Sequence, residues 1–172
     1  MRRPLAYLDA DVFINVMKRE RTLWPRSLGL LLAVERGDLR LVANRLLAVE
    51  VGRHRGDVEQ DKVEDFLYRW LVQVDVQWWE LDLRIEREAR RLSHELGLAA
   101  QDAVHLATAV LARADYFITR DLKFPLGADV EGVAVREPDV LWAPTTEDEE
   151  LRTALEAETA PPKKVVKAKK QS

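Results

Sequence analysis

Acidic side chains stand at four separate places in this sequence where they could take part in metal chemistry. Asp9 and Asp11 follow a short apolar run, and Asp121 follows another. Glu50 and Asp102 lie within segments whose apolar spacing is typical of helices. Carboxylate oxygens are the ligands that Mg²⁺ and Mn²⁺ prefer, so these acids would form a cation site if the fold brought them together.

Each acid also has an ordinary structural explanation. One of the pair Asp9 and Asp11 could cap a helix, because aspartate is a favoured N-cap residue. Asp102 would interact favourably with the positive end of its helix, and Asp121 is typical of a turn. Glu50 lies on the apolar stripe of its helix, where an unpaired carboxylate is costly to bury. It therefore needs a partner such as a cation, unless it sits at the edge of the stripe and reaches solvent.

Two further polar residues accompany these acids. Thr119 precedes Asp121 and brings a hydroxyl to the end of the same apolar run. His105 follows Asp102 by about one helical turn. We expect His105 to be a packed and hydrogen-bonded core histidine, outside the catalytic set.

The chemistry that such a cluster supports is the binding of divalent cations. Several carboxylates within a few ångströms of one another repel, so some would take up protons through raised and coupled pKa values, and a divalent cation removes this conflict. One or two such ions could polarise a phosphodiester and activate water. The sequence has no cysteine, which excludes disulfides, thiolate nucleophiles and cysteine-zinc sites.

The charge of the chain is unevenly distributed. The net charge is −3, but residues 159–172 contain five lysines and no acid, so residues 1–158 carry −8. Proteins that hold nucleic acid by neutralising phosphates are expected to carry net positive charge. A nucleic acid would therefore have to be held locally or through metal ions, which bind phosphate oxygens.

The positions of the apolar residues predict strands that alternate with helices. We expect strands at 5–8, 39–42, 74–81, 116–119 and 133–135, and helices at 12–17, 28–36, 45–55, 57–73, 82–96 and 99–112. This alternation predicts a three-layer α/β/α sandwich around a short, mainly parallel sheet. In such sheets ligands bind beyond the carboxyl ends of the strands, where Asp9 and Asp121 stand. Trp78 and Trp79 would face opposite sides of their strand.

The chain divides into one domain and a tail. Residues 1–143 are expected to form the domain, whereas 144–172 are expected to form a short acidic helix at 146–158 and a lysine-rich, disordered end. No run of apolar residues approaches the ~18 that suggest a membrane span. We therefore expect a cytoplasmic protein without membrane contact.

Over residues 5–135 the sequence resembles the PIN-domain family, and within it the toxin-like branch of VapC-type nucleases. The segment from Tyr7 to Val12 resembles the opening motif, and Glu50 falls where the helix glutamate of the family belongs. Residues 101–107 (QDAVHLA) are similar to the third motif, and 118–121 (ITRD) to the fourth. Asn44 departs from the serine or threonine that is usual at its position, and Asp11 stands where serine, threonine or asparagine is commoner.

The resemblance implies a Mg²⁺- or Mn²⁺-dependent ribonuclease that hydrolyses phosphodiester bonds of RNA. It implies that Asp9, Glu50, Asp102 and Asp121 are the acidic catalytic and metal-binding set and that Thr119 orients the site. Asp11 is a further candidate metal ligand, a neighbour of the ligands, or only a helix cap. The resemblance also implies a homodimer and a small antitoxin partner, with this chain as the toxin of the pair.

Two other functions fit parts of the sequence. The segment Leu8-Asp9-Ala10-Asp11-Val12 also resembles the opening motif of haloacid-dehalogenase-type phosphatases, in which Asp9 would be a nucleophile and Asp11 a general acid. That family also uses a lysine, for which Lys123 is available, but it would leave Glu50 and the helix of Asp102 without a task. The second alternative is a PIN-like module that binds RNA or protein without cutting.

Overall fold

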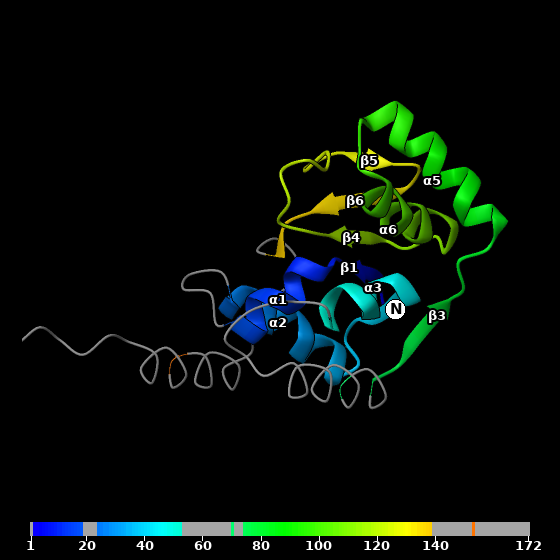
Figure 1. Cartoon of the computed structure of the whole chain (residues 1–172). Coiled ribbons are helices and arrows are strands. Elements are labelled where there is room, and N and C mark those ends of the chain that lie inside the picture. The colour runs from blue at the N-terminus through cyan, green and yellow to red at the C-terminus, as the bar shows by residue number, and fades with distance from the viewer. Residues whose placement is uncertain (1, 19–23, 53–69, 71–73, 139–152, 154–172) are drawn as a thin grey trace, which may run out of the picture.

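The computed structural model describes residues 2–18, 24–52, 70, 74–138 and 153. Most of the expected helix at 57–73, the expected acidic helix at 146–158 and the lysine-rich end lie outside these residues, so the division into a domain and a tail stays a prediction. Within the described part, strands and helices alternate along the chain (Figure 1).

The centre of the fold is a six-stranded, mainly parallel sheet in the order β3-β2-β1-β4-β6-β5. The strands are β1 (Leu5–Leu8), β2 (Arg40–Asn44), β3 (Val76–Trp79), β4 (Tyr116–Ile118), β5 (Asp129–Val130) and β6 (Val133–Arg136). Only the pair β5 and β6 is antiparallel. The expected parallel α/β fold is thus confirmed.

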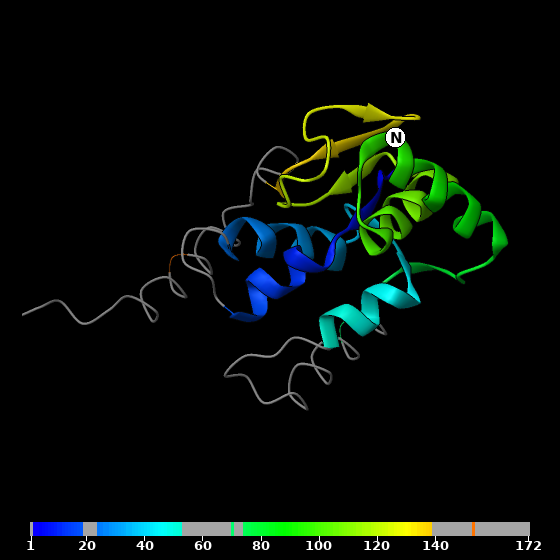
Figure 2. The same cartoon turned by 45° about the horizontal axis from the view of Figure 1, so that its top comes forward.

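Helices cover both faces of this sheet, as Figures 1 and 2 show from two directions. They are α1 (Ala10–Lys18), α2 (Trp24–Glu35), α3 (Arg45–Gly52), α5 (Leu83–Leu96) and α6 (Ala100–Leu111). Apolar residues of α1, α2 and α3 form one core with one face of the sheet, and those of α5 and α6 form a second core with the other face. The expected three layers are therefore present.

The two cores follow from the alternation of side chains along each strand. In β1, Tyr7 belongs to the core under α5 and α6, whereas the next residue, Leu8, belongs to the core under the other helices. Both residues are fully buried. Trp78 and Trp79 pack against the two different cores, as expected for neighbours on a strand.

The structure departs from the sequence-based expectation at the short strand β5. The sequence analysis missed this strand, because two residues are too few to show a periodic pattern. It forms a tight hairpin with β6, and the two turn residues Glu131 and Gly132 both have positive φ angles, of 52° and 87°. Such a turn matches the twist of the two strands that it joins.

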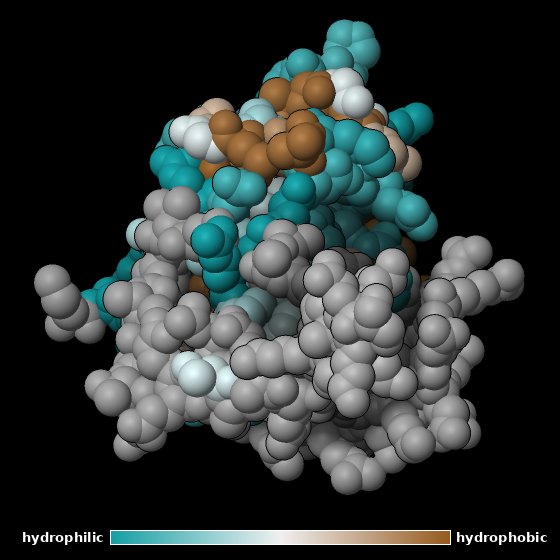
Figure 3. Space-filling view, turned by 90° about the vertical axis from the view of Figure 1, so that its left-hand side faces the viewer, coloured by the Kyte–Doolittle hydropathy of each residue, from teal (hydrophilic) through white to brown (hydrophobic). Residues whose placement is uncertain are grey.

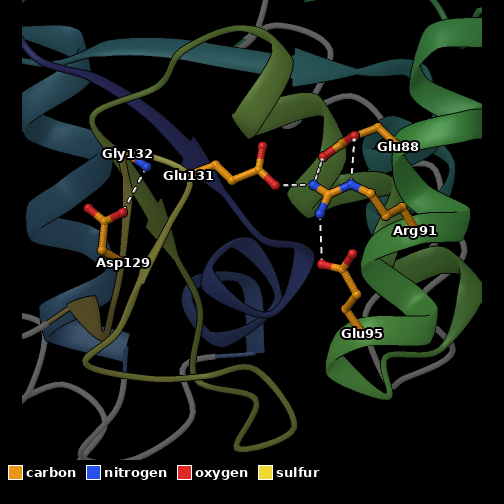
Figure 4. Close-up of polar contacts among 6 residues, drawn as sticks. All are labelled: Glu88, Arg91, Glu95, Asp129, Glu131 and Gly132. Atoms are coloured by element: carbon orange, nitrogen blue, oxygen red, sulfur yellow. Dashed lines mark hydrogen bonds and ion pairs between the residues drawn. The ribbon is translucent and has the colours of Figure 1, made fainter.

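One arginine joins this hairpin to the helical layer. The Arg91 guanidinium of α5 forms ion pairs with Glu88 and Glu95 of the same helix and with Glu131 of the hairpin turn (Figure 4). Asp129 accepts a hydrogen bond from the backbone N–H of Gly132 at 2.7 Å, which stabilises the turn that presents Glu131. These contacts lie far from the carboxyl ends of β1 and β4, so we assign them a structural role.

A helix that crosses a membrane must be long and almost entirely apolar. None of the helices in the described ranges combines the length and the apolar character needed to cross a membrane.

Candidate metal centre

Polar side chains gather where the central strands end. Asp9, Asn44 and Thr119 lie at one level, because each stands two residues after a member of the register row that contains Tyr7. The same two-residue step points all three side chains toward α6. The carboxyl ends of β1 and β4 face the side of the molecule drawn in Figure 3, where hydrophilic residues lie below a small hydrophobic group.

Asp9 is the central acid of this edge. Its residue is only 7% exposed, and its backbone N–H donates to the Ile118 carbonyl at 2.9 Å, which fixes it beside β4. Its carboxylate accepts hydrogen bonds from the Thr119 hydroxyl and from the Ala10 backbone N–H, both at 2.8 Å. Burial raises the pKa of the Asp9 carboxyl above its ordinary value, although His105 and these hydrogen bonds oppose the rise.

Asp11 is held by the loop that follows β4. Its Oδ2 accepts a hydrogen bond from the Arg120 backbone N–H at 2.7 Å and lies 3.4 Å from the Thr119 hydroxyl. Its Oδ1 is buried and has no hydrogen-bond partner among the described residues. Burial, with a smaller contribution from the charge of Asp9, raises the pKa of Asp11 to about 7. Asp11 is not the helix cap, since Asp9 occupies the position before α1.

Glu50 reaches the same edge from α3. Its side chain is 23% exposed, and its Oε2 lies 2.8 Å from Nε2 of His105 in α6. The other ring nitrogen, Nδ1, lies 2.6 Å from the Tyr7 hydroxyl. One ligand atom each from Asp9, Glu50 and His105 lie within 4.8 Å of one another. Helices from both layers thus supply groups to one cluster with Asp9.

Asp102 and Asp121 form the outer part of the site. They are not members of the 4.8 Å cluster, but their charges interact: the pKa of Asp102 is raised by burial, then by Asp121, and is lowered by Lys123. The Lys123 ammonium lies 3.6 Å from Asp121. Both acids also interact with the inner cluster. The charge of Glu50 contributes to the raised pKa of Asp102, and the Asp121 backbone N–H donates to the Thr119 hydroxyl at 3.1 Å.

Thr119 and Asn44 hold the surrounding elements in place. The single hydroxyl of Thr119 contacts Asp9 and Asp11 and accepts from the backbone after β4. Asn44 caps α3, because its Oδ1 accepts from the Leu47 backbone N–H at 3.0 Å, and its Nδ2 donates to Thr108 of α6 at 2.8 Å. Asn44 therefore fixes the helix that carries the glutamate relative to α6.

His105 is the residue whose place in the site the sequence analysis missed. It is fully buried and hydrogen-bonded, as expected, but it also contacts Glu50 and closes the cluster around Asp9. Its spacing of three residues from Asp102 was the available signal, because residues three apart lie on one side of a helix. The sequence could not show that α3 would bring a carboxylate to that side.

The residues present fit a divalent cation. Burial raises the pKa values of Asp9 and Asp11, and Oδ1 of Asp11 has no donor among the described residues. Ionised carboxylates in such surroundings are costly unless a positive charge accompanies them. Asp9, Glu50 and Asp11 offer oxygen atoms that suit Mg²⁺ or Mn²⁺, while His105 adds a nitrogen that could suit other transition metals.

Comparisons with known proteins agree with the fold. The family model for the PIN domain matches residues 6–128, which is most of the chain. The fold is similar to a structure of VapBC2 from Rickettsia felis bound to a DNA fragment from their promoter, with a TM-score of 0.56 and 10% identity over 77% of this chain and 98% of that one. It is also similar to a toxin-antitoxin complex from Klebsiella pneumoniae, with a TM-score of 0.55 and 22% identity over 75% and 95% of the two chains. No curated protein sequence gives a significant match.

The raised pKa of Asp11 predicts a pH-dependent stability of the metal-free protein. The folded-state pKa of about 7 lies above the unfolded value near 3.8, so the folded state binds more protons between these values. The free energy of unfolding should therefore fall as the pH rises from ~4 to ~7. Asp11→Asn removes this loss while keeping an oxygen for the Arg120 N–H, and should gain ~2–4 kcal/mol relative to wild type between pH 4 and 8.

Urea unfolding with a chelator present, at several pH values, measures this difference. Asp9 and Asp102 contribute to the pH slope of both proteins, so the difference between the two curves reports Asp11 together with its charge interaction with Asp9. Parallel curves for wild type and Asp11→Asn would show that Asp11 is ionised in the folded, metal-free protein.

Proposed function

Because this chain belongs to the PIN-domain family, we propose that it is a divalent-metal-dependent ribonuclease whose active site is the acid cluster at the carboxyl edge of the sheet. The observation that carries the proposal is the buried group of Asp9, Thr119 and Asp11 beside Glu50. A divalent cation would offset the charges of these carboxylates, and members of the family are generally nucleases; both points support the proposal.

The proposed roles follow from position and burial. Asp9 and Glu50 hold the cation at the centre of the cluster, and Asp11 lies close enough through Thr119 to contribute its unpartnered oxygen. When bound, one or two Mg²⁺ or Mn²⁺ ions supply a Lewis acid that polarises the scissile phosphodiester and lowers the pKa of water. Thr119 orients Asp9 by hydrogen bonding and keeps its carboxylate in one rotamer.

Asp102 and Asp121 act at the outer side of the cluster. Asp102 is only partly buried and its pKa is raised, so it can accept a proton from an attacking water more readily than an ordinary surface aspartate. Asp121 bonds to the backbone N–H of Lys123 and lies near its ammonium, which is largely exposed. Lys123 is thereby placed to meet the phosphate of an RNA strand that enters the site.

Metal binding also explains how an acidic protein can hold a polyanion. Residues 1–158 carry −8, so RNA would be repelled unless the cation site bridges protein and phosphate. Magnesium sites keep open positions for water and substrate phosphate, which suits this bridging role.

The two alternative functions, a phosphatase and a non-catalytic binding module, have less support than a ribonuclease. A phosphatase of the haloacid-dehalogenase type needs Asp9 as an accessible nucleophile, whereas Asp9 is 7% exposed and both its oxygens accept hydrogen bonds. In a PIN-domain ribonuclease, Glu50 and Asp102 would both have a role in the active site, whereas a phosphatase of the other type would leave them without one. A module that binds without cutting would have no need for acids gathered around the buried Asp9.

We also propose that the chain acts as the toxin of a toxin-antitoxin pair, as a homodimer in the cytoplasm. The support is its fold, which is similar to a chain of a Klebsiella pneumoniae toxin-antitoxin complex. A small antitoxin would inhibit it by placing a basic side chain among the acids of the cluster, where a positive charge is favourable.

Cleavage of total RNA tests the proposed activity. We expect wild-type protein to cut RNA with Mg²⁺ or Mn²⁺ and to be inactive with a chelator. Asp9→Asn should lower the rate at least about a hundredfold, because it removes a ligand charge while keeping the size and polarity of the side chain. Asp75→Asn is the matched control, because Asp75 is 80% exposed and lies before β3, at the amino ends of the parallel strands and away from the cluster. This variant should cleave RNA like wild type.

Three results would count against this assignment. Cleavage that survives the chelator would exclude the metal mechanism, and equal loss in both variants would show that the effect is not specific to the cluster. Folded protein that binds Mn²⁺ but cleaves no RNA would favour the non-catalytic alternative.

Induced expression in a bacterial host tests the toxin role. Wild-type protein should arrest growth, and Asp9→Asn expressed to the same level should not, since arrest depends on cutting RNA. Sedimentation of the purified protein tests the homodimer in the same set of samples. Normal growth with active wild-type ribonuclease present would contradict the toxin role and leave the ribonuclease assignment intact.

A further inference from the structure

A chain of three hydrogen-bonded side chains crosses the site from β1 to α3. The Tyr7 hydroxyl lies 2.6 Å from Nδ1 of His105, and Nε2 of the same ring lies 2.8 Å from Glu50. Tyr7 and His105 are both fully buried. The two contacts use both ring nitrogens, so the position of the ring protons decides what His105 does in the cluster.

The tyrosine end of the chain fixes the first hydrogen bond. The hydroxyl of a phenol has one proton to donate, and its distance of 2.6 Å from Nδ1 is that of a hydrogen bond. At the other end of the ring, an ionised carboxylate can only accept, so Nε2 must carry a proton to bond with Glu50. Among the described residues, the recorded acceptor for the hydroxyl is Nδ1 of His105. Tyr7 therefore donates to Nδ1, which must carry a lone pair.

The second hydrogen bond follows from the first. A neutral imidazole with a lone pair on Nδ1 carries its proton on Nε2. Nε2–H then donates to the Glu50 carboxylate, which is an acceptor when ionised. A ring nitrogen that holds a proton has no lone pair for a cation, so the closeness of the imidazole to Asp9 and Glu50 does not make Nε2 a ligand.

We propose that His105 is a positioning residue: its Nε2–H, fixed by the hydrogen bond from Tyr7, orients Glu50 toward Asp9, and the centre binds its cation through oxygen atoms alone. The inference rests on the proposed function only in assigning Glu50 to the cation. Asp9, Glu50 and His105 could form two kinds of metal centre, one in which the imidazole coordinates the cation and one in which it does not. The inference selects the second kind.

The hydrogen bond from His105 restricts the conformation of Glu50. Glu50 lies on α3 at a partly exposed position, where its side chain could otherwise adopt several rotamers. The hydrogen bond from His105 holds Oε2 of Glu50, and no hydrogen bond to the other carboxylate oxygen is recorded among the described residues, so that oxygen can meet a cation. Hydrogen bonds that orient ligating carboxylates commonly affect metal affinity by 10–100-fold when they are removed.

Nitrogen NMR of the imidazole rings tests the proton position in the wild-type protein. In ¹⁵N-labelled protein, metal-free and with saturating Mg²⁺, we expect the His105 signals of a neutral ring protonated on Nε2. His105→Gln assigns these signals by their disappearance. A proton on Nδ1 alone, or on both nitrogens, would overturn the inference, because Tyr7 could then not be the donor.

Two substitutions separate orientation from coordination by Mn²⁺ affinity. Gln places an amide N–H near the position of Nε2–H but has no imidazole nitrogen, whereas Leu fills similar space without a donor. We expect His105→Gln to bind Mn²⁺ within about threefold of wild type and His105→Leu to bind ~10–100-fold more weakly. An equal loss in both variants would show that the imidazole itself is a ligand.

These measurements do not depend on RNA cleavage. If the NMR and Mn²⁺ results are as expected but the protein cuts no RNA, the proposed function fails and the inference about His105 stands. If the protein cuts RNA and the ring is protonated on Nδ1, the inference fails and the proposed function stands. Because the NMR experiment uses wild-type protein, misfolding of the Leu variant would not protect the inference.

Discussion

The main constraint on this structure is the free-energy cost of removing several neighbouring carboxylates from water at the carboxyl edge of the sheet. Asp9 is buried and Asp11 is partly buried, and the pKa values of both rise chiefly because burial disfavours the charged form. The charge of Asp9 adds to the rise for Asp11, and the charge of Glu50 adds a little to the rise for Asp9. Hydrogen bonds from Thr119 and from backbone N–H groups oppose part of this cost. The remainder is what a divalent cation removes, and it is a reason to regard the cluster as a working site, since it costs stability without a cation.

The rest of the structure holds this cluster together from three directions. The parallel sheet brings the ends of β1, β2 and β4 to one level, α3 carries Glu50 over that edge, and α6 supplies His105 and Asp102 from the other layer. Asn44 joins the start of α3 to Thr108, so the two helical layers are linked at the site as well as through the sheet. The Arg91 contacts on the far hairpin serve the fold in another place, where no acid of the cluster lies.

Much of this could be predicted from the sequence, for identifiable reasons. Apolar runs that stop at acids mark the ends of strands, and this pattern predicts Asp9 and Asp121 at the carboxyl edge of the sheet, where they follow β1 and β4. The argument that Glu50 needs a partner also holds, but the partner in the structure is His105, 55 residues away in sequence. A contact between α3 and α6 depends on how both helices pack, and periodicity within either helix carries no information about it. Asp11 illustrates a second limit, because its main donor is the Arg120 backbone N–H, a group that every residue except proline possesses.

The most direct test of a metal centre between these acids is anomalous X-ray scattering from crystals of the protein soaked in Mn²⁺. The account predicts a Mn²⁺ peak within coordination distance of oxygens of both Asp9 and Glu50, with Nε2 of His105 outside the coordination shell. A peak bonded to neither carboxylate, in crystals of protein that cleaves RNA with Mn²⁺, would contradict it.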